Sequence, residues 1–428
     1  MQPSMEPMGP SVRLIRFPED RPVGSLIVEM WDGKAWQKTE VLLARGAIQV
    51  PKVGRRRLRW SATAHGLAPL DALQPDDLYS FETDGSWPHM ASELVHVEHL
   101  TGLRELRLGS RELVYSSLRP AGAIHLRGLH HLVRLSLGGT GLDDDEIQHL
   151  QDLTFLESLG LSTTQVTDRG LAALAGLGRL EQLDLTLTRL TGSGFSHLAG
   201  LSRLTGLYLG GTHLTSRSLR SLAVLGQLRD LHLGDARLQG AALRNLAGLA
   251  HLETLDASHN RIDDRSLPTV GRMRRLRWLQ LENTRMTGVG LRSLADLTAL
   301  ESLSLHRTSI DDESLVALEG MRQLRTLRLY ATALSGSGLQ HLFGNTKLVE
   351  LRLEHTLLES SKLVHLRHLI SLRHLILNDT PVTDAGLVHL EGLAALTYLG
   401  LRNTGVTAQG VAGLQRALPN CKIAAGPW

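Results

Sequence analysis

Residues 156–171 read LESLGLSTTQVTDRGL, and this stretch decides the fold. Its Leu-x-Leu pair, Leu159 and Leu161, recurs along the chain in one register. From Leu135 to Ile423 each step between equivalent positions is 24 residues. A repeat of constant length predicts a solenoid, because each unit can bury its apolar face only against its neighbours.

Each repeat divides into three parts. The Leu-x-Leu pair predicts a short strand whose intervening side chain points outward, because strand side chains alternate. A small polar position follows, and threonine fills it in ten repeats, which predicts a hydroxyl that satisfies the backbone of the turn. A capping pair such as Thr167-Asp168 then starts a helix with leucines three apart. The small residue Gly170 before the first of these predicts a close approach of neighbouring backbones.

This pattern resembles that of the leucine-rich repeat proteins. The T-D-x-G-L phrase, Thr167 to Leu171, is similar to that of many bacterial repeat proteins and, with Cys in place of Thr, of F-box-associated repeats. The resemblance covers about three quarters of the chain. It implies a right-handed α/β solenoid, with parallel strands on the concave face and helices on the convex face. The closing residues 417–423 resemble the capping strand of such arrays.

Four regions are predicted along the chain. Residues 1–18 are expected to be disordered. Residues 19–66 are expected to form a small all-β domain of four strands, too small for an independent core and leaning on the first repeats. Residues 67–105 are predicted to be a connector and an N-terminal cap or diverged first repeat, and residues 106–428 the repeat array with its capping strand. The predicted strands cover residues 24–31, 36–43, 47–51 and 56–62, and a loop is predicted between residues 111 and 123.

Composition favours a cytoplasmic protein. The 46 basic and 43 acidic residues nearly cancel, so the chain carries no strong attraction for nucleic acid. Cys421 is the only cysteine, which excludes a disulfide within the chain and fits a reducing compartment. Residues 1–20 show no signal-peptide pattern, and no run of about 18 apolar residues predicts a membrane span.

The outward strand residues are the predicted binding surface, because they have no packing role. Large groups gather on it from Tyr208 onward, and Trp, Tyr and Arg are typical of binding hot spots. Trp278 with Arg328 and Tyr330 is the most suggestive cluster. The alternative is that these side chains only decorate a solvated sheet. The predicted partner-binding residues are Tyr208, His232, Asp256, Trp278, Gln280, Glu282, His306, Arg307, Arg328, Tyr330, Arg352 and Tyr398.

Two arginine clusters, a histidine series and the single cysteine give no prediction of a binding or catalytic site. The arginines at 55–57 and 272–277 are expected on solvated edges. His341, His365 and His389 recur at one helix position and predict an outer ladder without a metal, because convergent ligands and second-shell support are not indicated. The cysteine near the C-terminus is expected to be a buried structural thiol.

The favoured function is a non-catalytic scaffold, monomeric and without cofactor or metal, that binds a protein partner on the concave face. Nucleotide loops, metal-ligand motifs and nucleophile elbows do not stand out, so no enzyme is predicted. The alternative is a regulatory adaptor of an enzyme, such as a ubiquitin-ligase-like substrate receptor or a GTPase regulator, with the β domain as a second docking site. A third possibility is that the β domain binds glycan through Trp31, Trp36 and Trp60.

Overall fold

The structure is a computed structural model that describes residues 12–20, 22–31, 34–51, 55–60, 67–83, 93–108 and 122–426. The chain divides into two compact units, Met1–Leu204 and Thr205–Trp428. The loop predicted between residues 111 and 123 lies almost entirely outside the described residues, as does most of the stretch predicted to be disordered.

The first unit opens with antiparallel strands. β2 (Gly24–Trp31) lies between β3 (Trp36–Leu43) and β5 (Arg55–Trp60), and β4 (Ala47–Pro51) pairs with β1 (Val12–Arg16). The predicted bounds of β2, β3 and β4 are confirmed, and β5 differs by one residue at its start and two at its end. β1 corrects the expectation that disorder extends to residue 18. Its alternating sequence VRLIR buries Ile15, and Phe17 after it is buried as well.

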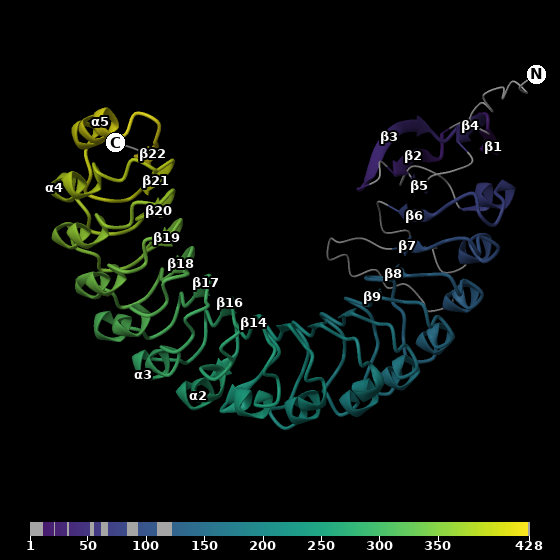
Figure 1. The fold of residues 1–428 in the computed structure, drawn as a ribbon, viewed down its shortest axis with the longest axis horizontal. Helices are drawn as coiled ribbons and strands as arrows, with labels where there is room; N and C mark the ends of the chain where they lie inside the picture. The colour runs from purple at the N-terminus through teal and green to yellow at the C-terminus, as the bar shows by residue number, and fades with distance from the viewer. Residues whose placement is uncertain are drawn as a thin grey trace, which may run out of the picture. The chain divides into compact units, whose positions relative to one another are not determined.

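The antiparallel strands are continuous with the first repeats. β5 pairs in parallel with β6, and parallel pairing then continues from strand to strand (Figure 1). The strands after β5 are β6 (Ser80–Thr83), β7 (Glu105–Arg107), β8 (Arg134–Ser136), β9 (Ser158–Gly160) and β10 (Gln182–Asp184). The β domain therefore leans on the repeats through a shared sheet, as expected for so few residues.

Arg55 and Arg56 correct the prediction of a solvated basic edge. Arg56 is buried, and its Nε and Nη2 donate to the carbonyl oxygens of Asp77 at 2.6 Å and Asp76 at 2.9 Å. Burial and the neighbouring Arg13 lower the pKa of Arg56. The Arg55 guanidinium lies over the aromatic rings of Trp36 and Tyr79. Alternation along β5 explains the burial, because Leu58 shares the inward face with Arg56.

The second unit is a regular stack of parallel strands. The strands lie on the inner side of its curve and the short helices on the outer side (Figure 1). Both leucines of each Leu-x-Leu pair are buried, as Leu279 and Leu281 show. A separate two-stranded ladder joins β13 (Gln239–Gly240) to β15 (Arg261–Ile262). The stack comprises β11 (Gly206–Tyr208), β12 (Asp230–His232), β14 (Thr254–Asp256), β16 (Trp278–Gln280), β17 (Ser302–Ser304), β18 (Thr326–Arg328), β19 (Glu350–Arg352), β20 (His374–Ile376), β21 (Tyr398–Leu401) and the capping strand β22 (Lys422–Ala425).

Most of the predicted helices are short 3₁₀ helices of three to seven residues. Leucines exactly three residues apart fit the 3.0 residues per turn of a 3₁₀ helix, so one face stays apolar. In the first unit they are η1 (Ala68–Ala72), η2 (Leu94–His96), η3 (Ala123–Leu126), η4 (Ile147–Leu150), η5 (Gly170–Leu174) and η6 (Phe195–Gly200). In the second they are η7 (Ser218–Val224), η8 (Ala242–Leu246), η9 (Asp264–Ser266), α2 (Leu267–Val270), α3 (Gly288–Arg292), η10 (Asp312–Leu318), η11 (Ser337–Leu342), η12 (Ser360–Leu366), α4 (Asp384–Leu387), η13 (Val388–Leu390) and α5 (Ala408–Ala417).

The threonine column has the predicted role. In each of the ten repeats the hydroxyl donates to the carbonyl oxygen three residues earlier, as Thr164 does to Leu161 at 2.7 Å. Ala236 has no hydroxyl for Leu233. Asn260 of the next repeat supplies the missing donor, since its Nδ2 lies 2.7 Å from the Leu233 carbonyl oxygen.

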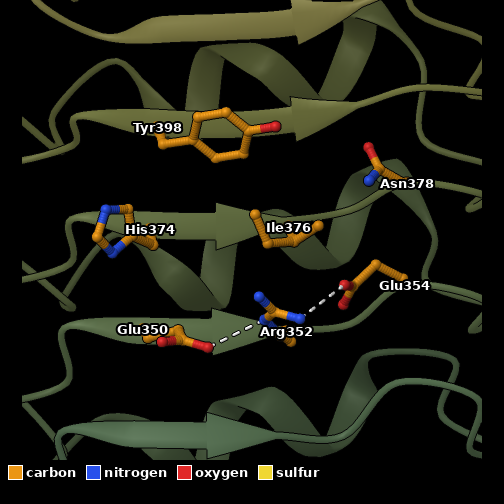
Figure 2. A pocket seen from close by; sticks show the side chains of 7 residues that line it. All are labelled: Glu350, Arg352, Glu354, His374, Ile376, Asn378 and Tyr398. Carbon is orange, nitrogen blue, oxygen red and sulfur yellow. Dashed lines mark ion pairs between the residues drawn. The ribbon is translucent and has the colours of Figure 1, made fainter. Parts of the chain in front are cut away.

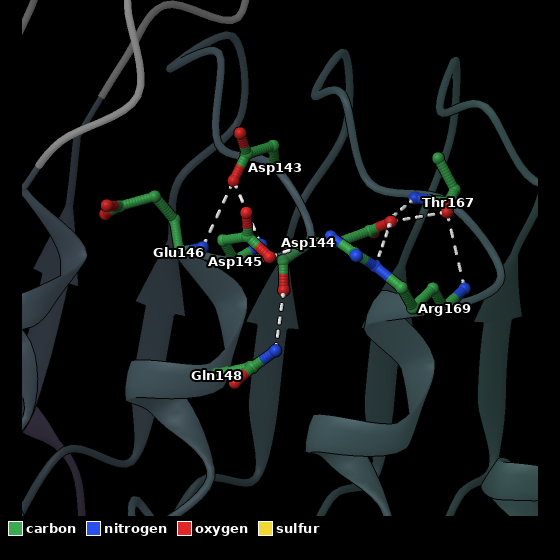
Figure 3. A network of polar contacts seen from close by, with 7 residues as sticks. All are labelled: Asp143, Asp144, Asp145, Glu146, Gln148, Thr167 and Arg169. Carbon is green, nitrogen blue, oxygen red and sulfur yellow. Dashed lines mark hydrogen bonds and ion pairs between the residues drawn. The ribbon is translucent and has the colours of Figure 1, made fainter.

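The two residues of the capping pair have different roles: the first caps the turn of its own repeat, and the second bonds to the next repeat. Thr167 caps its own turn, because its hydroxyl accepts from the amide of Arg169 at 3.3 Å. The carboxylate of Asp144 reaches from the preceding repeat and accepts from the amide of Thr167 at 2.8 Å and from its hydroxyl at 2.5 Å (Figure 3). In the same way Asp168 accepts four hydrogen bonds from residues 191–194. The second residue of the pair therefore ties its repeat to the next one.

Gly170 shows why a small residue precedes the first helix leucine. A Cβ at Gly170 would lie 2.5 Å from Oδ1 of Asp144, the same carboxylate that binds Thr167. At Gly170 the predicted approach of two backbones is wrong, because a side chain approaches the backbone there; at Gly194 it is confirmed, because a Cβ would lie against the carbonyl oxygen of Asp168.

Candidate functional site

The candidate site is the strand face of the second unit. We use this name for the outward side chains of β11 to β21 and for the residue two positions after each strand. From β12 to β21 these side chains stand on short strands paired on both sides, which makes the surface rigid.

Tyr208 and His232 begin the strand face as a stacked pair. Their ring centroids lie 4.7 Å apart, and Nδ1 of His232 lies 3.8 Å from Oδ2 of Asp256. The Asp256 carboxylate also accepts from the amide of Ser258 at 2.9 Å. Burial alone would raise the pKa of Asp256, but the nearby His232 and the hydrogen bonds from Ser258 together lower it. Asp256 is thus an anchored carboxylate.

Trp278 is the most exposed aromatic side chain of the predicted set described on this face, at 39% exposure. It begins β16, and the Arg277 guanidinium lies 4.7 Å from its ring centroid. Arg277 itself pairs with Glu301. Gln280, at the other end of the strand, is half-buried. The indole is therefore held in place while much of it remains available.

His306 and Tyr330 form a second stacked pair, with ring centroids 3.9 Å apart. Burial, assisted by nearby arginines such as Arg307, lowers the pKa of His306 to about 4, so the ring is neutral at pH 7. Burial raises the pKa of Tyr330 and of Glu282. Ser304 Oγ lies 2.9 Å from Nδ1 of His306. Arg307 is exposed and has a left-handed backbone, with φ 55.

Ser304, His306 and Glu282 do not make a nucleophile and base. Ser304 is 3% exposed, so a substrate cannot reach its hydroxyl. A histidine whose pKa is about 4 is also a weak base at neutral pH. This cluster is packing of polar groups on the strand face.

Two arginines share one carboxylate near the end of the strand face. Nε of Arg328 lies 3.2 Å from Oε1 of Glu350, and Nε of Arg352 lies 2.9 Å from the same oxygen. The second contact is an ion pair whose angle does not make a hydrogen bond. Nη1 of Arg352 lies 3.9 Å from Oε1 of Glu354. Burial raises the pKa of Glu354.

A hollow of about 530 Å³ opens beside this network. Figure 2 shows Arg352 between the two glutamates, with Ile376 on the next strand and Tyr398 on the strand beyond. The residues that line it are Glu350, Arg352, Glu354, His374, Ile376, Asn378 and Tyr398.

The structure places the predicted residues on one face but not in one cluster. Thr326, and not Arg328, is in register with Trp278 two strands away. Arg328 and Tyr330 contact Glu350 and His306 instead. The predicted set also omits Ile376 and Asn378, which line the hollow. The falling side-chain size along the outward column of β19 to β21 was a signal that could have found them.

The remaining predictions concern residues outside the strand face. His341 Nδ1 lies 2.6 Å from Oε1 of Glu319. Within the described ranges, no group of three or more His, Cys, Asp or Glu residues could hold a metal ion. Cys421 is buried, which raises the pKa of its thiol, as expected for a structural cysteine. A helix long and apolar enough to cross a membrane is not found in the described part of the chain.

Comparisons with known proteins agree with this geometry. The family model for leucine rich repeats matches residues 274–334. The internalin InlF of Listeria monocytogenes is 24% identical, with a TM-score of 0.57 over 71% of this chain and 82% of that one. A leucine-rich repeat protein of Leptospira interrogans is 16% identical, with a TM-score of 0.56 over 82% and 96%. The functional domain of InlJ from Listeria monocytogenes is 16% identical, with a TM-score of 0.51 over 70% and 64%. No curated protein matches the sequence.

The fold and the repeat define a solenoid of parallel strands and short helices. Residues 274–334 match the leucine rich repeat model, and the chain shares the fold of the leucine-rich repeat proteins to which it is similar. Solenoids of this class commonly use their extended inner surface for protein–protein interaction.

Proposed function

We propose that the protein is a non-catalytic scaffold that binds a protein partner on the strand face of its second unit. The observation that carries this proposal is Trp278, a large aromatic side chain that is 39% exposed on a rigid strand. Burying an exposed indole in an interface removes a large apolar area from water, which is why tryptophan dominates binding hot spots.

Preorganisation supports the same conclusion. The stacked pairs Tyr208–His232 and His306–Tyr330 and the network around Glu350 already hold their side chains in one arrangement. Binding would therefore cost little side-chain entropy. The mixture of acidic and basic groups favours a protein over nucleic acid, which requires a continuous basic surface. We infer a cytoplasmic monomer from the composition and the single cysteine.

The test is capture of a partner followed by quantitative binding. The intact chain and the variant Trp278→Ala/Arg328→Ala/Tyr330→Ala are compared, and Phe343→Ala, exposed on the opposite side of the repeat, is the control. We expect the purified partner to bind the control normally and the triple variant at least about 100-fold more weakly, since each hot-spot truncation costs about 2 kcal/mol. Equal binding to all three would refute the placement.

A second docking site on the β domain is favoured by one observation. Val41 and Leu43 on β3 are 49% and 67% exposed. This exposure supports the adaptor alternative, in which the β domain holds an enzyme such as a ubiquitin ligase or a GTPase. We expect Val41→Lys/Leu43→Lys to lose that second protein and keep the strand-face partner. Retention of both proteins would remove the adaptor proposal.

For the glycan alternative, Trp36 is covered on one side by Arg55, and the side chains of Trp31 and Trp60 lie outside the described residues.

A further inference from the structure

The hollow exists because side-chain size falls along one column of the strand face. Arg352 on β19 is in register with Ile376 on β20, and Ile376 with Gly400 on β21. A Cβ at Gly400 would lie 2.9 Å from Oδ1 of Asn378 and 3.1 Å from Cγ2 of Ile376. Glycine therefore leaves the space above Ile376 open, next to the charged network.

The charges beside the hollow are paired unevenly. Glu350 holds both Arg328 and Arg352, so its carboxylate is compensated twice. Glu354 has a single ion pair, to Arg352 at 3.9 Å, which is too long for a hydrogen bond. Among the described residues, its Oε2 has no hydrogen-bond partner although the side chain is only 14% exposed. A buried carboxylate oxygen without a donor is costly, so the Glu354 carboxylate gains if it turns toward a donor that enters the hollow.

The apolar and aromatic lining completes the fit. Ile376 is 9% exposed and forms a floor, with His374 beside it on the same strand and Tyr398 on the strand beyond (Figure 2). Methylene groups pack well on such a floor, and a guanidinium stacks on an aromatic ring. Arginine combines a methylene stem with a planar fork of N–H donors that matches a carboxylate.

We propose that this hollow receives an arginine side chain of the protein partner, with the stem over Ile376, the guanidinium plane beside Tyr398 and an N–H directed at Glu354. The inference rests on the proposed function, because the arginine belongs to the partner. It adds a second anchor, four strands along the face from Trp278.

The experiment uses the full chain, labelled at isoleucine δ1 methyl groups, and N-acetyl-arginine-N-methylamide as the probe. We expect a saturable shift of the Ile376 methyl signal with a dissociation constant in the millimolar range, as is usual for so small a ligand. Ile262 and Ile310, which are buried elsewhere in the second unit, serve as internal references and should not move. Absence of an Ile376 shift would overturn the inference.

Two matched comparisons test the charge. Citrulline in the same blocked form has nearly the same shape as arginine without the charge, and we expect it to bind at least about ten-fold more weakly. Glu354→Gln should weaken the arginine probe by a similar factor. Glu313→Gln is the control, because Glu313 is exposed, lies outside the strand face and does not line the hollow. Equal binding of the arginine and citrulline probes would contradict an arginine site. Tighter binding of a lysine probe, blocked in the same way, than of the arginine probe would also contradict it.

The outcomes are separable from those of the proposed function. If the triple substitution abolishes partner binding but the probe does not shift the Ile376 signal, the proposed function stands and this inference is wrong. If the probe shifts the Ile376 signal but the triple variant still binds the partner, the hollow remains an arginine site and the placement of the partner at Trp278 is wrong.

Discussion

Asp312 illustrates how a single residue connects two repeats. Its carboxylate accepts from the amides of Ser335, Gly336 and Gly338 and from the hydroxyl of Ser335, all in the following repeat. Burial would raise the pKa of Asp312, but these hydrogen bonds together lower it. The ionised form is thus the one that the folded chain requires.

Stability should depend on pH through this group. The pKa of Asp312 is lower in the folded chain than its unfolded value of about 3.9. Its contribution is therefore fully present above that pH and is lost as the pH falls through the folded pKa. We expect Asp312→Asn to lower the melting temperature at pH 7 and to show a smaller further loss than wild type between pH 4 and 2. Glu313→Ala, at an exposed side chain, is the control and should follow wild type.

The residue before the first helix leucine is glycine because the aspartate position of the preceding repeat lies against it and leaves no room for a Cβ. A Cβ at Gly338 would lie against the backbone carbonyl of Asp312 and 2.8 Å from its Cα. We expect Gly338→Ala to reduce the free energy of unfolding in urea by about 1–3 kcal/mol through overpacking. At Gly344 a Cβ would meet nothing closer than 3.6 Å, so Gly344→Ala should be neutral or slightly stabilising. Similar losses in both variants would show that the close approach of the Asp312 backbone is not the cause.

Turns are the elements that carry most of the polar bonding between repeats. Asn260 Nδ2 donates to the carbonyl oxygens of Leu233, Ala257 and Ser258, and its Oδ1 accepts from the amide of Leu238. One buried amide therefore serves the turns of two repeats, which is why the neighbouring repeat tolerates Ala236.

A double-mutant cycle tests this exchange. Asn260→Thr should lose about 2 kcal/mol or more, because the amide of Leu238 becomes unpaired and the carbonyl of Leu233 keeps only the amide of Ala236 at 3.3 Å. Adding Ala236→Thr supplies a hydroxyl to Leu233 and should recover about 1 kcal/mol. Chemical denaturation of the two single variants and the double variant measures the coupling. Strictly additive losses would mean that the two positions do not share a partner.

The sequence predicts the elements well where one residue type repeats in one register. The leucine period predicts the strands, and the threonine column predicts the turn bonding. The 3₁₀ form of the helices was also readable from the spacing of three. Arg56 could not be placed, because its burial depends on carbonyl oxygens near Asp77, which are distant in sequence. The hollow beside Arg352 was missed for a similar reason: it depends on a missing side chain at Gly400.

At the scale of the whole molecule, contacts between repeats are local. Each strand pairs with its immediate neighbours, and each aspartate reaches one repeat onward. In such solenoids a destabilising substitution affects mainly its own repeat and the adjacent repeats, because stability is a sum of repeat and nearest-neighbour terms.

Hydrogen exchange should show this locality. We expect Asn260→Ala to speed exchange of the amides in β12, β14 and β16 by more than about ten-fold, which corresponds to 1.4 kcal/mol of local stability. Amides of β7 to β9 in the first unit should keep their wild-type protection. A uniform increase across both units would instead indicate that the chain unfolds as one cooperative body.

The coupling of aspartate and glycine also limits how such a gene can grow or shrink. Gly170, Gly194, Gly290, Gly338 and Gly410 each follow a repeat that carries the aspartate, whereas Ser266, Ser314 and Lys362 follow repeats that carry glycine there. Deleting residues 265–288 keeps the period but sets Ser314 behind Asp264, where no side chain fits. Repeats of this protein are therefore not interchangeable cassettes: recombination that preserves the reading frame and the length must also preserve which repeat precedes which.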